Sequence, residues 1–311
     1  MPFLGVDSWR WQYFEHQPCP ENVVVPIDDA TAWALFPAQR WIYNRLLIAD
    51  TQGLPNGPHG TEPPGFPVFS KPIYNMRGMG TGSRVIRSPE EYEDAIQPGH
   101  MWMALCTGPH VSTDVALRRG EPLWWRHTTG VASGDGTFDH WTIHAETMPE
   151  LDAVLLPWVR RHLDGFTGII NFETIGGSII ECHLRMSEQW LDLNGAGWLN
   201  AVVALYTNGA WPFTDERRTG YSVVLFAGHG IPWRIDRSQI PPLLREPHIS
   251  SIQITFEEEV PLAQHAMPPG GFRLAIVNCW DLEAGRAVRS RLAQLFEAAT
   301  PGRLRSAERP L

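Results

Sequence analysis

The sequence predicts an α+β fold, and three observations lead to that class. The chain has 311 residues, 43% of them hydrophobic, which is enough for a large core without disulfides or a structural metal. Many apolar runs are about four to eight residues long and lie between turn residues, as strands do. A few longer segments carry helix caps or an apolar period near 3.6 residues. The same composition excludes intrinsic disorder.

The elements follow in chain order. Residues 1–45 are aromatic-rich and irregular, and the Pro/Gly cluster at 50–66 predicts a loop. The helix at 88–96 is predicted by Ser at the N-cap position, followed by Pro and acidic residues. The helix at 149–163 is predicted by its apolar period. The further expected helices are 189–206 and 282–299, and the expected strands are 66–72, 83–87, 100–106, 111–117, 122–127, 168–174, 178–185, 221–227, 249–256 and 272–278.

Charge and composition restrict the class of protein. The net charge of −9 argues against nucleic acid or an anionic membrane as the main partner. No apolar run approaches the roughly 18 residues of a membrane-spanning helix, and no signal-peptide pattern is apparent. The four cysteines lack the spacing of a zinc site or a disulfide framework. We therefore expect a cytoplasmic protein with small-molecule partners, and a homodimer if it assembles, since dimers are the commonest oligomers.

The basic residues are unevenly divided between arginine and lysine. Of the 25 basic residues, Lys71 is the only lysine. A genome biased towards arginine explains this without any function. The functional interpretation is that this position needs a compact ammonium rather than a planar guanidinium. Composition alone does not decide between the two.

The strands 168–174 and 178–185 can bring acidic residues together. Side chains alternate between the two faces of a strand, so Glu181, His183 and Arg185 share one face. A three-residue loop, 176–178, places Glu173 opposite Glu181 and Asn171 opposite His183, and we predict that loop. A two-residue turn would instead place Glu173 opposite Ile180.

Two adjacent carboxylates repel each other, so the pair favours a bound cation. Mg²⁺ prefers oxygen ligands and keeps positions open for phosphate oxygens. Arg185, on the same face, can hold a phosphoryl group by a forked hydrogen bond. An exposed sheet face with a Glu181–Arg185 ion pair is the alternative interpretation of these residues.

Upstream, Lys71 is followed by a glycine-rich stretch, 75–83, in which Gly78, Gly80 and Gly82 alternate with other residues. Lysine supplies a point charge and the loop supplies backbone N–H groups, which together suit a polyphosphate. The spacing matches neither the phosphate loop that ends in Gly-Lys-Ser/Thr nor the GxGxxG motif. Alone, such a loop is a weak signal.

The order of these motifs resembles the ATP-grasp superfamily over roughly residues 38–206. Phe66-Pro-Val-Phe-Ser-Lys-Pro72 is similar to its lysine-bearing strand, and 75–83 to its glycine-rich loop. Gly108-Pro-His-Val-Ser-Thr-Asp114 resembles the segment after its hinge. Gly168-Ile-Ile-Asn-Phe-Glu173 and Glu181-Cys-His-Leu-Arg185 resemble its paired strands with metal ligands.

The resemblance implies a role for each matching residue. Lys71 and Arg45 would contact the ATP phosphates, with Gly78, Gly80 and Gly82 in the covering loop. Met103, Leu105 and Cys106 would form the hinge that holds adenine. Glu173, Glu181 and His183 would take the positions for Mg²⁺, with Mn²⁺ as a substitute. Lys71 and Arg185 would act in catalysis, with Arg185 on the transferred phosphoryl group.

The resemblance also implies an architecture. We expect an ATP-grasp fold in which two α+β lobes grip the nucleotide, with a shortened N-terminal segment and a small C-terminal α+β region. The expected divisions are a pre-ATP-grasp-like segment at 1–45, a small lobe at 46–107, a large lobe with the metal site at 108–207, and the C-terminal region at 208–311.

The implied function is an ATP- and Mg²⁺-dependent carboxylate–amine ligase. A small-molecule carboxylate would be activated as an acyl phosphate and attacked by an amine or a similar nucleophile. A non-catalytic nucleotide-binding or scaffold protein and a small-molecule kinase are the alternatives. Four residues depart from the family pattern: His183 replaces Asn, His110 replaces Glu, and Met103 and Ala104 stand where the hinge acid is expected. The identities of the substrates are not encoded in any motif of the sequence.

Overall fold

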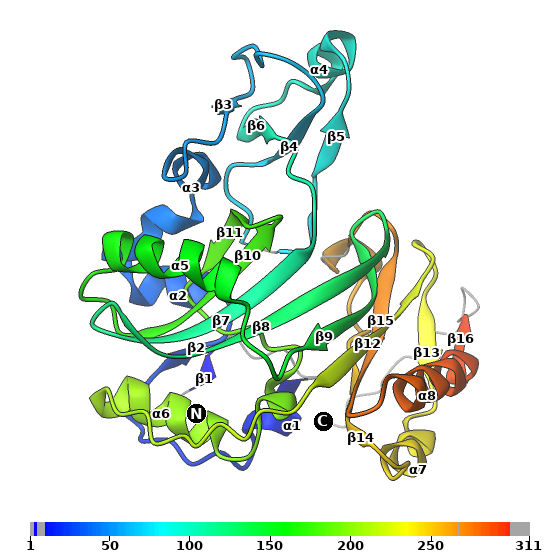
Figure 1. The fold of residues 1–311 in the computed structure, drawn as a ribbon. Helices are drawn as coiled ribbons and strands as arrows, with labels where there is room; N and C mark the ends of the chain where they lie inside the picture. Colours follow the sequence, from blue (N-terminus) through cyan, green and yellow to red (C-terminus); the bar gives the residue numbers. More distant parts are fainter. Residues whose placement is uncertain (1–2, 5–9, 77, 266–267, 299–311) are drawn as a thin grey trace, which may run out of the picture.

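The fold is α+β, as predicted, and is built on two antiparallel sheets (Figure 1). The computed structural model describes residues 3–4, 10–76, 78–265 and 268–298. None of the helices in these ranges has the length and hydrophobicity needed to span a membrane. The elements outside the two sheets include β1 (Phe3–Leu4) with β2 (Val25–Pro26), β13 (Trp233–Ile235) with β16 (Phe296–Ala298), and the short helices α1 (Trp11–Phe14), α7 (Ile240–Leu244), η4 (Arg237–Gln239) and η5 (Leu262–Gln264).

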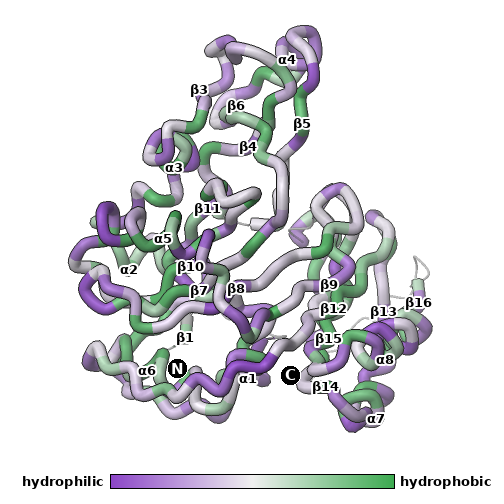
Figure 2. Tube along the Cα trace, viewed as in Figure 1, coloured by the Kyte–Doolittle hydropathy of each residue, from purple (hydrophilic) through white to green (hydrophobic). Residues whose placement is uncertain are grey.

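The larger sheet has eight strands in the order β11-β10-β7-β8-β9-β12-β15-β14. Their bounds are β11 (Ser178–His183), β10 (Gly168–Ile175), β7 (His110–Arg118), β8 (Glu121–Gly134), β9 (Thr137–Ile143), β12 (Gly220–Ala227), β15 (Phe272–Cys279) and β14 (Ile249–Ile254). Because β9 pairs with β12, strands on both sides of residue 207 belong to one continuous sheet. Figure 2 shows mainly hydrophobic traces along β12 and β15, in keeping with a packed core.

The smaller sheet has the strand order β3-β6-β4-β5 and stands apart from the larger one in Figure 1. It comprises β3 (Asn56–Pro58), β6 (His100–Ala104), β4 (Val68–Pro72) and β5 (Arg84–Ile86). Helix α4 (Pro89–Ala95) packs on one face, and its N-cap Ser88 accepts a hydrogen bond from the Glu91 N–H, as predicted. The other face packs against α3 (Arg45–Asp50) and Ile180.

Helices cover the large sheet unequally. Helix α5 (Pro149–His162) packs on the face that carries Val111, Val115 and Phe172, together with α2 (Asp29–Leu35) and η2 (Pro37–Tyr43). On the opposite face, α6 (Trp198–Asn208) packs against Ala116 and Ile169 at one end of the strands. The other end of that face carries polar side chains, and this polar end is where the candidate site lies.

Two predicted helices are wrong in their bounds. The expected helix at 282–299 ends at Leu295 as α8 (Leu282–Leu295), and the next residues form the strand β16 (Phe296–Ala298). The expected helix at 189–206 is divided into η3 (Leu191–Asn194) and α6. Gly195 and Gly197 lie between the two with φ values of +107° and +83°, which are incompatible with a continuous right-handed helix. The apolar period was therefore a correct signal for burial but not for helix length.

Candidate functional site

The β10–β11 hairpin has the predicted cross-strand pairs. Glu173 lies opposite Glu181, and Asn171 lies opposite His183. On the other side of β10, Glu173 pairs with Ser112 of β7. The hairpin therefore presents two carboxylates side by side at the polar end of the sheet.

The predicted three-residue loop is wrong, although it led to the correct pairing. Ile175 pairs with Ser178, which leaves a two-residue Gly-Gly turn. A β-bulge at Ile180 then inserts one residue into β11 and shifts the register by one. The turn needs glycine at 176, where φ is +56° and a Cβ atom would lie 2.1 Å from the carbonyl oxygen of Thr107.

The three positions predicted to bind metal each face a different partner. These contacts are Glu173 with His110 at 2.7 Å, Glu181 with Arg45 in an ion pair, and His183 Nδ1 with Asp29 at 3.0 Å. Within the described part of the chain, no three His, Cys, Asp or Glu side chains are grouped as a metal site requires. Asp29 holds the His183 ring through Nδ1, and the metal role of this set stays a prediction.

Lys71 and Arg45 form a buried basic pair, and each is 5% exposed. Lys71 Nζ donates a hydrogen bond of 2.8 Å to the carbonyl oxygen of Ile180, the bulged residue. Arg45 donates one of 3.0 Å to the carbonyl oxygen of Pro72. Burial and the neighbouring Arg45 lower the pKa of Lys71 to about 7, and burial lowers the pKa of Arg45 to about 10. Burial thus makes each positive charge costly, and Glu181 offsets that cost for Arg45 by pairing with it.

The glycine-rich loop lies between β4 and β5. Gly78, Gly80 and Gly82 all have φ between +61° and +76°, a left-handed conformation that favours glycine. The Asn75 side chain bridges the start of the loop by donating to the Gly78 carbonyl at 2.9 Å and accepting from the Gly78 N–H at 3.1 Å. Around Gly78 and Gly80 no other atom lies within 4 Å of a Cβ position, so the loop is open on that side.

The predicted hinge residues follow the course of β6 out of the small sheet. Met103 is 2% exposed and packs with Met101 and Ala49. Leu105 and Cys106 come directly after the strand and are partly buried, with Cys106 beside the same apolar cluster. The segment 104–109 then leads into β7, so it connects the two sheets as a hinge would.

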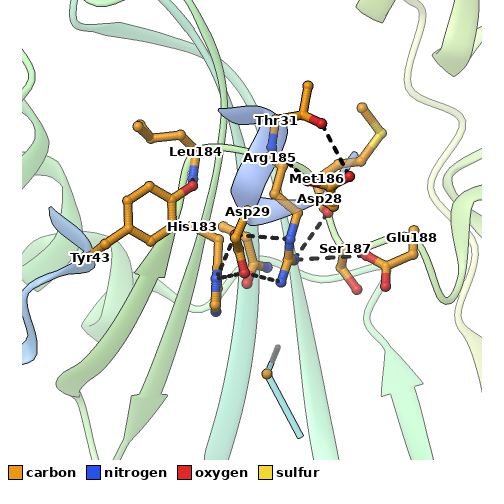
Figure 3. Close-up of polar contacts among 12 residues, drawn as sticks. Asp28, Asp29, Thr31, Tyr43, His183, Leu184, Arg185, Met186, Ser187 and Glu188 are labelled. Atoms are coloured by element: carbon orange, nitrogen blue, oxygen red, sulfur yellow. Dashed lines mark hydrogen bonds and ion pairs between the residues drawn. The ribbon is translucent and has the colours of Figure 1, made fainter. Parts of the chain in front are cut away.

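Arg185 is held by an acidic residue that the sequence did not reveal. Its Nε lies 3.3 Å from Asp29 Oδ1 and its Nη2 donates to Asp29 Oδ2 at 3.4 Å, while Glu188 is 3.8 Å away (Figure 3). Burial opposes ionisation of Asp29, but Arg185 and His183 hold its pKa well below the usual range. Asp29 is 4% exposed and lies in the first turn of α2, more than 150 residues from its partners in sequence.

Asp114 is a second buried acid in the polar end of the sheet. It accepts hydrogen bonds of 2.9 Å from Asn171 Nδ2 and from the Ser187 N–H. Burial raises its pKa to about 7, although both hydrogen bonds oppose that shift. Its place in the motif at 108–114 was a signal for this site, but its burial could not be deduced from the motif.

Two surface depressions lie away from these residues. One, of about 410 Å³, is bordered by Trp158, His162 and Ser178, and another, of about 460 Å³, by Trp124 and Trp211. Neither is lined by Lys71, Arg45 or Arg185. The candidate site is therefore identified by its buried charges and its place between the two sheets rather than by cavity size.

Comparison with solved structures identifies the architecture. An L-amino acid ligase from Bacillus licheniformis aligns over 94% of this chain and 84% of its own, with a TM-score of 0.63 and 14% identity. A phosphoribosylamine–glycine ligase from Thermotoga maritima aligns over 92% and 85%, with a TM-score of 0.60 and 14% identity. A carboxyaminoimidazole ribonucleotide synthase from Aspergillus clavatus, complexed with ATP, aligns over 88% and 81%, with a TM-score of 0.57 and 14% identity. The chain has the ATP-grasp fold.

No protein-family model and no curated protein sequence matches the chain. The ATP-grasp fold is therefore shown by the comparison of structures alone. In this fold the basic pair belongs to the small sheet and α3, whereas the acidic pair belongs to the large sheet. The hydrogen bond from Lys71 to the Ile180 carbonyl oxygen connects the small sheet to the large sheet.

Proposed function

We propose that this chain is an ATP- and Mg²⁺-dependent ligase that joins a small-molecule carboxylate to an amine or a similar nucleophile. The observation that carries the proposal is the buried Lys71–Arg45 pair, which faces the bulge of the acidic hairpin. Two enclosed cations, of which Arg45 is paired with Glu181, favour a polyanion such as a nucleoside triphosphate. The names of the structural neighbours, an L-amino acid ligase and a phosphoribosylamine–glycine ligase, support ligation as the reaction.

Phosphoryl transfer depends mainly on positioning and charge neutralisation, and each residue of the candidate site contributes to one of these. Lys71 and Arg45 bind phosphate oxygens, and the backbone N–H groups of the glycine-rich loop cover them. Arg185 binds the phosphoryl group as it moves to the substrate carboxylate. The carboxylate attacks the γ-phosphorus of ATP, the bond to ADP breaks, and an acyl phosphate forms. The amine then attacks the acyl carbon, phosphate leaves, and the nitrogen loses a proton.

The donors at the hairpin fit a magnesium ion in part. Glu173 and Glu181 offer the carboxylate oxygens that Mg²⁺ prefers, and they lie opposite each other. His183 does not fit as well, because imidazole is a poorer ligand for this ion and Asp29 holds its Nδ1. When bound to the two glutamates, the ion would neutralise phosphate charge.

Calorimetric titration of ATP with Mg²⁺ tests the nucleotide site. We expect micromolar binding to the wild type and at least tenfold weaker binding to Lys71→Ala. Arg87→Ala is the matched control, since Arg87 is an exposed basic residue of the same lobe, and it should bind ATP normally. Equal affinity of Lys71→Ala and the wild type would contradict the proposal.

A non-catalytic nucleotide-binding protein is the second candidate. It is favoured by one observation: Glu181, His183 and Arg185 all have charged partners within the chain. Release of phosphate from ATP with pools of amino acids and amines would exclude it. ATP binding without phosphate release in any pool would favour it, and a phosphorylated product without condensation would indicate a kinase.

A further inference from the structure

Asp29 lies where the N-terminal segment meets the strand pair of the candidate site. Its two carboxylate oxygens each lie 3.0 Å from His183 Nδ1, and both also contact the Arg185 guanidinium. Figure 3 shows the carboxylate between the two side chains. With 4% of its surface exposed, Asp29 is enclosed by these contacts.

The contacts of Asp29 with His183 and Arg185 do not serve to cap helix α2. The N-cap of α2 is Asp28, whose side chain accepts a hydrogen bond of 2.6 Å from the Thr31 N–H. Asp29 therefore has no capping task, and its carboxylate is directed to the sheet. The neighbouring Tyr43 accepts a hydrogen bond of 3.2 Å from the Leu184 N–H, which fixes the strand end between the two partners.

The contacts define the orientation of Arg185. Its Nε and Nη2 are on the Asp29 side, and its Nη1 donates to the Met186 carbonyl oxygen at 3.2 Å. A long side chain with three engaged nitrogens has lost most of its rotamer freedom, which is the condition for precise placement of a charge. Without Asp29, the acidic groups left near Arg185 are Glu188, whose carboxylate lies 3.8 Å from Nη1, and Asp114, which acts on it electrostatically.

We propose that Asp29 is a positioning residue that holds Arg185 and His183 in place for the transferred phosphoryl group. The inference rests on the proposed function, since it assigns Arg185 to that group. It also assigns a partner within the chain to His183 Nδ1. The segment before residue 45 then contributes directly to the site, through one carboxylate from α2.

The test uses ADP with Mg²⁺, in the absence and presence of aluminium fluoride, which mimics a phosphoryl group in transfer. Transition-state mimics bind at least about a hundredfold more tightly than ground-state ligands, so we expect a gain of that order for the wild type. In Asp29→Asn, which keeps the size but removes the charge, this gain should fall at least tenfold. The dissociation constant for ADP alone should change less than threefold.

Asp28→Ala is the matched control. It removes the cap of the same helix and should lower the melting temperature, yet keep the fluoride-dependent gain, whereas a merely structural Asp29 would behave like Asp28. Asp29→Glu should recover part of the gain because it restores the charge. If aluminium fluoride tightens ADP binding to Asp29→Asn as much as to the wild type, the positioning role of Asp29 is overturned, but the proposed phosphoryl transfer is not. No gain in the wild type would overturn phosphoryl transfer itself, and the role of Asp29 with it.

Discussion

Lys71 makes nucleotide binding depend on pH in a way that can be calculated. Burial and Arg45 lower its pKa to about 7 in the free protein, so about half of the molecules carry the charge at pH 7. Bound phosphates stabilise the ammonium and return its pKa towards the ordinary value of about 10.4. Nucleotide binding is then coupled to proton uptake by this one side chain.

The direction and size of the effect follow from that shift. Below pH 7 the lysine is already protonated, so it contributes no pH dependence. Above pH 7 the proton must be taken up on binding, and affinity falls about tenfold, or about 1.4 kcal/mol, per pH unit. Between pH 7 and 8.5 the affinity falls about 15-fold.

The assay is calorimetric titration of ATP at pH 6.5, 7.5 and 8.5, in two buffers of different ionisation enthalpy that report proton uptake. Lys71→Arg is the matched control, because arginine stays charged throughout and the titration of ATP itself cancels between the two proteins. If the affinity for ATP falls equally with pH in the wild type and in Lys71→Arg, and both take up the same number of protons on binding, the proposed titration of Lys71 is refuted.

Three further predictions concern stability. Because the pKa of Lys71 is lowered on folding, the free energy of unfolding of the wild type should rise with pH from about 7 to 10. Lys71→Met should be the more stable protein near pH 7, and the difference between the two should shrink by about 1.4 kcal/mol per pH unit. Thermal unfolding of both proteins across this pH range measures the difference. Glu181→Gln leaves the buried Arg45 without its carboxylate and should lower the free energy of unfolding in urea by about 3 kcal/mol. Glu121→Gln, which breaks an ion pair on the surface, should lower it by less than about 1 kcal/mol. Equal losses of stability in the two variants would contradict this prediction. Gly176→Ala should destabilise the hairpin turn more than Gly177→Ala, since only at 176 does the new Cβ meet a backbone carbonyl at 2.1 Å; equal melting temperatures would count against the turn described above.

The sequence by itself determined much of the hairpin and of the small lobe. Alternation along residues 178–185 assigned Glu181 and His183 to one face, because side-chain direction in a strand is a local property. The cap at Ser88 and the glycine-rich loop at 75–83 were likewise local features that the structure contains, and the structure adds that Gly78, Gly80 and Gly82 are left-handed. The ATP-grasp fold followed from the order of such segments, and the structural neighbours agree with it.

Tertiary structure decided what the polar side chains touch. The bulge at Ile180 was not encoded in the alternation, yet it sets the register of the acidic pair and supplies the carbonyl that holds Lys71. The partners Asp29 and Arg45 lie more than 130 residues before the residues that they contact. Such pairings depend on how α2 and α3 pack against the sheet, and a periodic pattern within one strand carries no information about that packing. The sequence therefore indicated which residues share a face, and only the packing of distant segments determined which charges neutralise them.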